Sequence, residues 1–210
     1  MHPLAQSVLE FWFSKDAQPL WFAKSFEFDQ KISHQFGKVL ESATAGECAD
    51  WRCDILGRLA EIIVLDQFSR NIHRDTPKAF EADGMALVLS QEAIVLPEFE
   101  SLALDERKFM LMPYMHSESK LIHKKAMTLF EQFTDATTVA YEHRHKEIID
   151  EFGRYPHRNA ILGRASTTQE QAFLKKPNSS FQAMLCCDCQ LFLMKRIKGL
   201  VEFIKRFIID

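Results

Sequence analysis

Residues 152–164 concentrate positive charge and hydrogen-bonding side chains in one short segment. Two glycines and a proline keep the segment out of regular helix, and no acidic residue occurs between Glu151 and Glu170. Guanidinium groups bind carboxylates and phosphates through paired hydrogen bonds, and histidine and asparagine add further polar groups. The segment therefore predicts a site for a small anion, with five side chains as candidate ligands: Arg154, His157, Arg158, Asn159 and Arg164.

A carboxylate and a guanidinium at helical spacing form the second candidate group. Asp66 lies near the end of the most apolar stretch of the chain, Arg70 follows four residues later, and Asn71 adds an amide. A buried carboxylate is unfavourable unless it is paired, and residues four apart share a helix face. Two interpretations are open. The pair is either an internal ion pair that fixes the helix end, or a device in which Asp66 orients Arg70 to bind a carboxylate or phosphate.

A histidine and a carboxylate two residues apart form the third candidate group. His116 and Glu118 straddle an expected helix start, and a neighbouring carboxylate can fix the tautomer of an imidazole and raise its basicity. Together with His157 they are the candidate catalytic residues for proton transfer. The alternative is that Glu118 only favours the helix dipole and that His116 is a hydrogen-bonded core residue.

A metal site is a further interpretation of these side chains. His145 lies two helical turns before the basic segment, so three histidines and one carboxylate are available as ligands: His116, Glu118, His145 and His157. No two of these histidines share a short ligand motif, and the chain contains no phosphate-binding loop, dinucleotide fingerprint or nucleophile elbow. We therefore expect no metal and no cofactor, and we assign His145 to the ligand-binding residues.

The composition is that of a compact protein without secretion features. The chain has 210 residues, 47% of them hydrophobic, which is enough for one domain with its own core. A formal net charge of -3 argues against general nucleic-acid binding. The N-terminal residues lack a basic start and an apolar core, no apolar run approaches the roughly 20 residues of a membrane span, and the five cysteines do not resemble a disulfide framework. We expect a cytoplasmic protein.

Apolar residues recur at helical spacing along most of the chain, and no stretch alternates as a strand would. The sequence therefore predicts an all-α fold of eight or nine helices. The 55–70 helix is apolar around so much of its circumference that it should lie in the middle of the domain. The other expected helices span residues 4–13, 26–42, 77–90, 104–112, 118–133 and 138–151, with a last one before Pro177.

Single residues mark several of the expected helix ends. Thr76 should cap the 77–90 helix and Ser117 the 118–133 helix, because hydroxyl side chains accept hydrogen bonds from the free N–H groups of a first turn. Pro113 should end the 104–112 helix, and Gly153 should close the 138–151 helix. Thr167 begins a capping box that starts the last helix.

Residues 182–210 differ in character from the rest of the chain. Apolar residues at spacings of three and four are separated by lysines and arginines, which predicts an amphipathic helical extension. Its apolar face would pack on the domain or on a second copy of the chain, which would give a homodimer. The alternative is a basic amphipathic helix that lies on an anionic membrane surface.

These motifs together resemble a bacterial family of uncharacterised proteins known as DUF924. The resemblance covers about residues 4 to 181 and rests on segments 8–13, 21–22, 65–71, 116–118, 152–159 and 162–164, and on His145. It implies one DUF924-like domain over residues 1–181, followed by the extension 182–210. It also implies a tetratricopeptide-like stack of antiparallel helix pairs with a concave face, and no established activity. One departure is His123, where many members have glutamine.

The candidate residues support three functional hypotheses. In the first, they converge in a pocket for a small anionic ligand, with His116 or His157 as general acid or base in hydrolysis or transfer on a phosphate or carboxyl ester. In the second, the concave tetratricopeptide-like surface binds a protein or peptide, with the basic segment on an acidic terminus. In the third, the arginines, histidines and Asp66 form a buried structural network that closes the helical stack.

Overall fold

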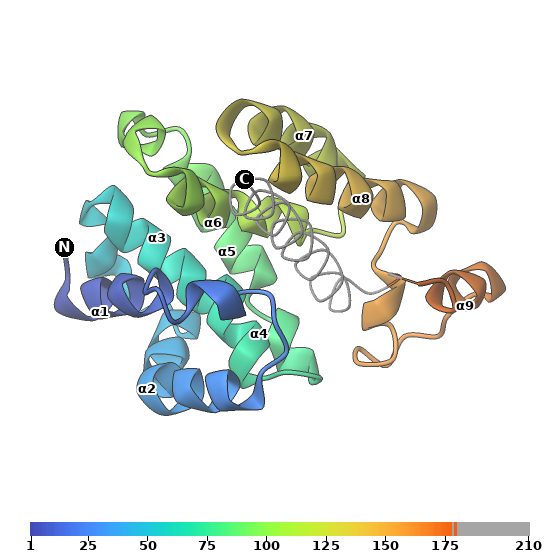
Figure 1. Ribbon diagram of the computed structural model, residues 1–210, viewed down its shortest axis with the longest axis horizontal. Coiled ribbons are helices and arrows are strands. Elements are labelled where there is room, and N and C mark those ends of the chain that lie inside the picture. Colours follow the sequence, from blue (N-terminus) through green and yellow to red (C-terminus); the bar gives the residue numbers. More distant parts are fainter. Residues whose placement is uncertain (178, 180–210) are drawn as a thin grey trace, which may run out of the picture.

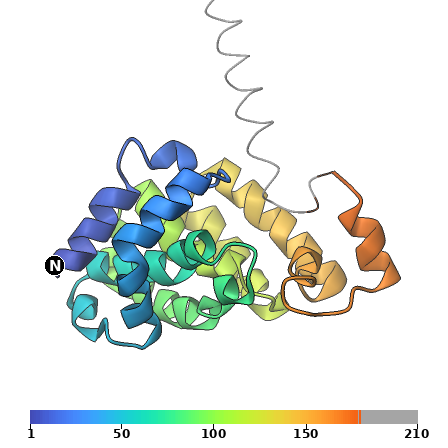
Figure 2. The same cartoon turned by 90° about the horizontal axis from the view of Figure 1, so that it is seen from below.

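The computed structural model describes residues 1–177 and residue 179 (Figures 1 and 2). A π-helical turn, Val64–Phe68, joins α3 to α4 in one continuous helix, so the described residues form eight helices and no strand. This confirms the predicted all-α fold of eight or nine helices. The elements are α1 Pro3–Trp12, α2 Phe26–Thr44, α3 Ile55–Ile63, α4 Ser69–Ile72, α5 Asp83–Ala93, α6 Leu104–Met115, α7 Lys120–Phe133, α8 Ala136–Phe152 and α9 Thr168–Leu174.

An aromatic cluster holds α1 and α2 against the central helix and α6. Trp12 is fully buried, and its ring lies edge-on to Phe68 and Phe109 with centroid separations of 5.6 and 5.3 Å. Phe28 of α2 stacks on the same indole at 6.2 Å. Large aromatic side chains dominate the energy of a core because each removes so much apolar surface from water. The cluster therefore fixes the helix that carries Asp66 and Arg70.

The central helix, residues 55–72, is the most buried element among the described residues. Every residue from Glu61 to Ser69 is buried, which confirms the expected central position. Glu61 is tolerated there because Arg52 donates to both of its carboxylate oxygens, at 2.7 and 2.6 Å. The π turn places an extra residue in one helical turn at Asp66, and such turns are frequent at functional sites.

Helices α5 to α8 pack on one another in the order in which they follow along the chain. α7 and α8 form an antiparallel hairpin, since only Thr134 and Asp135 separate them and they pack on each other (Figure 1). α7 also packs on α6, and α6 on α5. After α8 the chain leaves regular α-helix over residues 153–167, and α9 lies at the end of the molecule far from the N-terminus (Figure 1). A tetratricopeptide-like stack stays a prediction from the resemblance.

Two expected helix ends around His116 are wrong. Pro113 does not end its helix, because α6 continues to Met115 with the proline buried in its last turn. Core packing on this turn outweighs the hydrogen bond that proline cannot donate. Ser119, not Ser117, caps α7 by accepting from the backbone N–H of Ile122, whereas the Ser117 hydroxyl accepts from the N–H of Ser119 at 3.2 Å.

The predicted helix over residues 77–90 is also wrong in its first turns. Residues Pro77–Phe80 form a 3-10 helix, and the α-helix begins only at Asp83. The Thr76 hydroxyl does not cap the first turn, since it donates to the carbonyl of His73 at 2.7 Å. A local side-chain to backbone hydrogen bond has replaced the cap.

The expected C-terminal end of α8 and the expected start of α9 are confirmed, whereas α8 begins at Ala136, two residues before the expected start. Gly153 closes α8 in the left-handed conformation, with φ of 70°, which glycine adopts without steric penalty. The Thr167 hydroxyl accepts from the N–H of Glu170 at 3.2 Å, and the Glu170 carboxylate accepts from the N–H of Thr167 at 2.7 Å. This is the predicted capping box.

The predicted extension over residues 182–210 lies outside the described residues, and so do its homodimer and membrane-surface alternatives. Within the described part of the chain, no helix combines the length and the apolar character needed to cross a membrane.

Gly57→Ala should destabilise the fold. The added Cβ would lie 1.9 Å from the backbone oxygen of Trp51, so the 3-10 helix Ala49–Cys53 would have to move. Overpacking of this kind lowers the free energy of unfolding by about 1 to 3 kcal/mol. Gly37→Ala is the matched control, because nothing lies within 4 Å of its added Cβ, and it should gain about 0.5 to 1 kcal/mol. Urea unfolding measures both, and equal stability of the two variants would contradict this packing.

Candidate functional site

His116 and Asp66 form a hydrogen-bonded pair between the end of α6 and the π turn. Nδ1 of His116 lies 2.7 Å from Oδ1 of Asp66, whose side chain is 1% exposed. Gln67 donates to the other carboxylate oxygen at 2.5 Å, and a guanidinium nitrogen of Arg70 lies 3.1 Å from Oδ1. The partner of His116 is therefore Asp66, which is 50 residues away in sequence, and not the neighbouring Glu118 as the sequence suggested.

The pKa shifts of the pair define its protonation. Burial raises the pKa of Asp66, but the charges of Arg70 and His116 and the hydrogen bonds from His116 and Gln67 outweigh it, so the pKa lies below its usual range. Burial and then the charge of Arg70 lower the pKa of His116, and the opposing effect of Asp66 is smaller. Near neutral pH the carboxylate is therefore ionised and the imidazole is neutral.

The ionised carboxylate also fixes the tautomer of the imidazole. Asp66 can only accept, so the hydrogen of His116 lies on Nδ1 and the lone pair on Nε2. Nε2 has no hydrogen-bond partner among residues 1–177 and 179, and 15% of the His116 side chain is exposed. This arrangement gives His116 a free proton-accepting atom that points away from its buried orienting carboxylate.

Arg70 and Arg158 converge on one carboxylate, that of Asp83 at the start of α5. Arg70 lies 2.8 Å and Arg158 3.1 Å from its oxygens. Arg70 comes from α4, and Arg158 comes from the 3-10 helix Pro156–Arg158 in the predicted basic segment. The structure thus brings the guanidinium of residue 70 together with one arginine of the basic segment.

The guanidinium of Arg158 packs against two aromatic rings. Its guanidinium carbon lies 4.5 Å from the centroid of Phe80 and 4.6 Å from that of Tyr155. It is 6% exposed, and its Nε has no hydrogen-bond partner among the described residues. Burial and the charge of Arg70 lower the pKa of Arg158, although Asp83 opposes them. The environment of Arg158 therefore favours additional negative charge.

Glu118, Arg164 and Asn159 form a neighbouring network. Arg164 binds both oxygens of Glu118, at 2.6 and 2.9 Å, and donates to the amide oxygen of Asn159 at 3.0 Å. Glu118 also accepts from the backbone N–H of Tyr155 at 2.8 Å. Burial raises the pKa of Glu118, but the hydrogen bonds from Arg164 and Tyr155 outweigh it and lower the pKa. This network fixes the fold of residues 155–164 beside the Asp66–His116 pair.

His145 and His157 both lie next to Tyr155. Their ring centroids are 5.7 and 5.4 Å from that of the tyrosine. Burial lowers the pKa of His145 well below its usual value, and burial with the charge of Arg158 lowers the pKa of His157 to about 4. Both imidazoles are thus neutral near neutral pH, and His157 lies near enough to Arg158 to feel its charge.

Two predicted ligand residues lie elsewhere. Arg154 binds both carboxylate oxygens of Glu170, at 2.6 and 2.9 Å, at the start of α9. Asn71 donates to Asp29 of α2 at 2.7 Å. The structure brings neither side chain to the Asp66–His116 pair.

Sequence reasoning missed three contributors to the group. Asp83 supplies the carboxylate shared by two arginines, and Phe80 and Tyr155 hold the guanidinium of Arg158. Tyr155 lies inside the basic segment, which was a usable signal, since aromatic rings often stack on arginine. Asp83 is 75 residues from Arg158, and no spacing in the sequence connects them.

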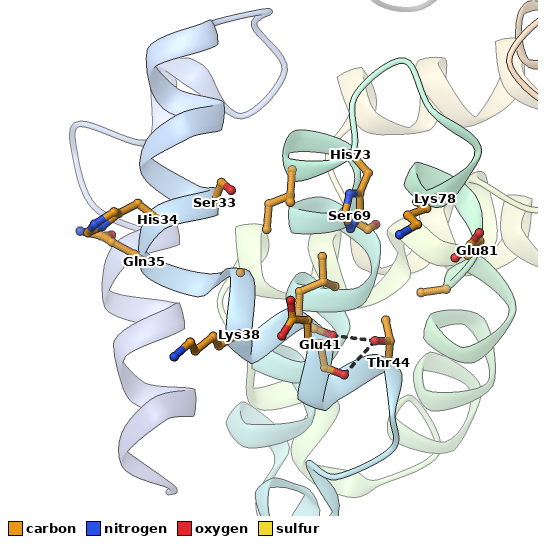
Figure 3. A pocket seen from close by; sticks show the side chains of 14 residues that line it. Ser33, His34, Gln35, Lys38, Glu41, Thr44, Ser69, His73, Lys78 and Glu81 are labelled. Atoms are coloured by element: carbon orange, nitrogen blue, oxygen red, sulfur yellow. Dashed lines mark hydrogen bonds between the residues drawn. The ribbon is translucent and has the colours of Figure 1, made fainter.

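A separate hollow of about 650 Å³ lies beside α4, on a different face from the one that carries Arg70 (Figure 3). It is lined from α2 and from the residues around α4, among them Glu41, Ser69, His73 and Lys78, and it contains none of the predicted site residues. Among the described residues, no group of three or more His, Cys, Asp or Glu side chains is arranged to hold a metal ion.

Comparisons with known proteins place this chain in a family. Residues 8–178 match the family described as "Bacterial protein of unknown function (DUF924)", and the chain belongs to this family. A solved structure of a protein of unknown function from Agrobacterium tumefaciens is similar, with 31% sequence identity, a TM-score of 0.77, and coverage of 82% of this chain and 97% of that chain. No curated protein matches closely enough to indicate a relationship.

Asp66→Asn should lower the free energy of unfolding by roughly 3 to 5 kcal/mol, because it breaks a buried pair and leaves the charge of Arg70 less compensated. The pKa of Asp66 is depressed in the fold, so its contribution is present above the unfolded pKa of 3.8 and decreases as the pH falls below it. The difference between wild type and variant should therefore shrink below about pH 4.

Asp150→Asn is the control for this measurement. The Lys146–Asp150 pair on α8 is exposed, and such pairs contribute below about 0.5 kcal/mol. Urea unfolding at pH 7 and pH 3 measures both variants. A loss for Asp66→Asn that is as small as that for Asp150→Asn would show that the buried pair does not stabilise the fold.

Proposed function

We propose that Asp66, Arg70, His116 and Arg158 form a site for a small ligand that bears a phosphate or a carboxylate. In this proposal His116 transfers a proton in hydrolysis or group transfer on a phosphate or carboxyl ester. The observation that carries it is the 2.7 Å hydrogen bond between Asp66 and His116 beside two guanidinium groups that share one carboxylate.

The charges around Arg158 support an anionic ligand. Arg70 and Arg158 share Asp83, while Asp66 is divided between Arg70 and His116. The pKa of Arg158 is lowered by burial and by Arg70, so an incoming anion would relieve the repulsion between the two guanidinium groups. The rings of Phe80 and Tyr155 restrict the guanidinium of Arg158, and its planar fork is suited to binding two oxygens of one group.

The protonation of His116 supports general base chemistry. Nε2 would accept the proton of a water or a substrate hydroxyl as its oxygen attacks the phosphorus or carbonyl carbon. The imidazolium that forms is stabilised by Asp66, and it returns the same proton to the oxygen of the leaving group. Arg70 and Arg158 would stabilise the negative charge that develops on the substrate oxygens. His157 is the second candidate acid or base, since its neutral ring lies beside Tyr155 next to Arg158.

A structural network is the competing interpretation, and it too has an observation in its favour. The four arginines of the hypothesis each contact a carboxylate already, namely Asp66, Asp83, Glu118 or Glu170. A purely structural role predicts that substitutions in the set change stability and leave every binding and activity measurement unaffected. A protein- or peptide-binding role of the helical surface would instead give co-purifying partners and no response to small anions.

His116→Gln should abolish the activity that a screen of phosphate monoesters and carboxyl esters detects, with a fall of at least about 100-fold in kcat/KM, because the general base is lost. Asp66→Asn should cause a loss of the same order, since an amide can stabilise the other tautomer. His143→Gln is the matched control, because His143 is exposed on α8 and its nearest acidic partner, Glu147, is 3.7 Å away. Activity that survives in His116→Gln would dismiss the catalytic assignment.

Inorganic phosphate should bind to the wild-type protein, and Arg158→Lys should weaken this binding about tenfold, because lysine cannot reproduce a planar two-point contact. Arg154→Lys makes the same change at a guanidinium that is bound to Glu170 and should leave phosphate affinity unchanged. Isothermal titration calorimetry in a phosphate-free buffer measures both. Equal weakening in the two variants would indicate nonspecific electrostatic attraction instead of this site.

A further inference from the structure

Three consecutive backbone carbonyls around His116 each accept a hydrogen bond from a different part of the fold. The carbonyl of Met115 accepts from the Tyr155 hydroxyl at 2.6 Å, and that of His116 accepts from Arg158 at 3.1 Å. The carbonyl of Ser117 lies 2.8 Å from Nε2 of His123, on α7. We refer to these three contacts as the carbonyl clamp. They hold the turn between α6 and α7 from which the His116 imidazole reaches Asp66.

The His123 end of the carbonyl clamp rests on a buried partner. Nδ1 of His123 lies 2.7 Å from Oε1 of Glu142 on α8, and both side chains are fully buried. The other oxygen of Glu142 has no hydrogen-bond partner among the described residues. An ionised carboxylate with an unsolvated oxygen is strongly unfavourable in such a place, and burial accordingly raises the pKa of Glu142.

The hydrogen-bond partners of His123 and Glu142 require the pair to hold one shared proton. The carbonyl of Ser117 can only accept, so the hydrogen of His123 lies on Nε2, which is also 3.2 Å from the Tyr155 hydroxyl oxygen. The Tyr155 hydroxyl donates its own hydrogen to Met115. Nδ1 of His123 and Oε1 of Glu142 must then share one proton. If that proton is lost, one nitrogen of His123 faces an acceptor without a hydrogen, either at Glu142 or at Ser117.

We propose that His123 and Glu142 are positioning residues for His116, which act through a shared proton and the carbonyl clamp. This inference rests on the proposed function, because a positioning role has meaning only if His116 does chemistry. The pair touches neither the His116 ring nor Asp66, so it acts through the backbone of residues 115–117. The groups around the pair on which its electrostatics also depend are His143, His145, Lys146 and Asp150 of α8, and Tyr155.

The test measures the tautomer and the pKa of the His116 imidazole and needs no substrate. Long-range ¹H–¹⁵N correlation spectra of the full-length ¹⁵N-labelled protein report the tautomer and pKa of each histidine, and the His116 signals are assigned by their loss in His116→Gln. In the wild type, His116 should carry its hydrogen on Nδ1 and titrate below 6.5, its ordinary value.

His123→Ala should move the His116 midpoint upward toward 6.5 and remove the preference for the Nδ1 tautomer, because the released turn exposes the ring. Tyr155→Phe keeps the ring and removes the donor to Met115 together with the weaker 3.2 Å contact to Nε2 of His123, so it should shift the same midpoint in the same direction by less. It serves as the second variant should His123→Ala fail to fold. Glu142→Gln should leave His116 unchanged, because its amide can donate to Nδ1 of His123 as the protonated carboxyl does.

Several outcomes would overturn the proposal. A folded His123→Ala or Tyr155→Phe with an unchanged His116 midpoint and tautomer would show that the carbonyl clamp does not position the ring. A shift in Glu142→Gln as large as that in His123→Ala would refute the shared proton. His143→Gln, a substitution at the exposed histidine next to Glu142 in sequence, is the control and should leave the His116 midpoint and tautomer unchanged. Failure of the substrate screen leaves these spectra interpretable, so the two proposals fail separately.

Discussion

The buried carboxylate of Asp66 is the constraint on which the arrangement of the candidate site depends. A charge at 1% exposure is tolerated only when its oxygens are hydrogen-bonded and an opposite charge lies nearby. Gln67 and Arg70 from the same helix meet part of this requirement, and His116 completes it from α6. The π turn makes this possible, because the extra residue in that turn changes how side chains are presented along the helix.

The hydrogen bonds and ion pairs around Asp66 connect distant segments of the chain in one polar group. Arg70 forms an ion pair with Asp83 on α5, and Asp83 forms a second one with Arg158 in the segment after α8. Arg158 in turn donates to the backbone carbonyl of His116. Such a closed chain of charge-assisted hydrogen bonds is stiff, since moving one member leaves another unpaired in a poorly solvated place. Stiffness of this kind holds reacting groups in place, and it equally stabilises a helical stack. The same contacts therefore serve both interpretations, and only substrate and anion measurements separate them.

Membership in a family of unknown function makes the local chemistry the main source of functional information. The similar Agrobacterium structure supports the fold over most of the chain and adds no activity. What distinguishes the site from an ordinary surface ion pair is a combination of three features: a neutral imidazole whose Nε2 has no partner in the described part of the chain, a buried orienting carboxylate, and a guanidinium packed against two rings. Surface pairs lack all three features because water supplies their hydrogen bonds.

The helical class, the central place of the 55–70 helix, the close of α8 at Gly153 and the start of α9 at Thr167 all followed from the amino-acid sequence, because apolar periodicity and capping are local properties. The sequence also indicated which residue types carry chemistry, but it did not reveal that Arg154 and Asn71 lie away from the other predicted site residues. The pairing of Asp66 with His116, 50 residues away, and of Glu118 with Arg164, 46 residues away, became visible in the folded chain alone. Pairing at such separations depends on how whole helices pack, and helix packing is set by the core and not by the spacing of the polar residues themselves.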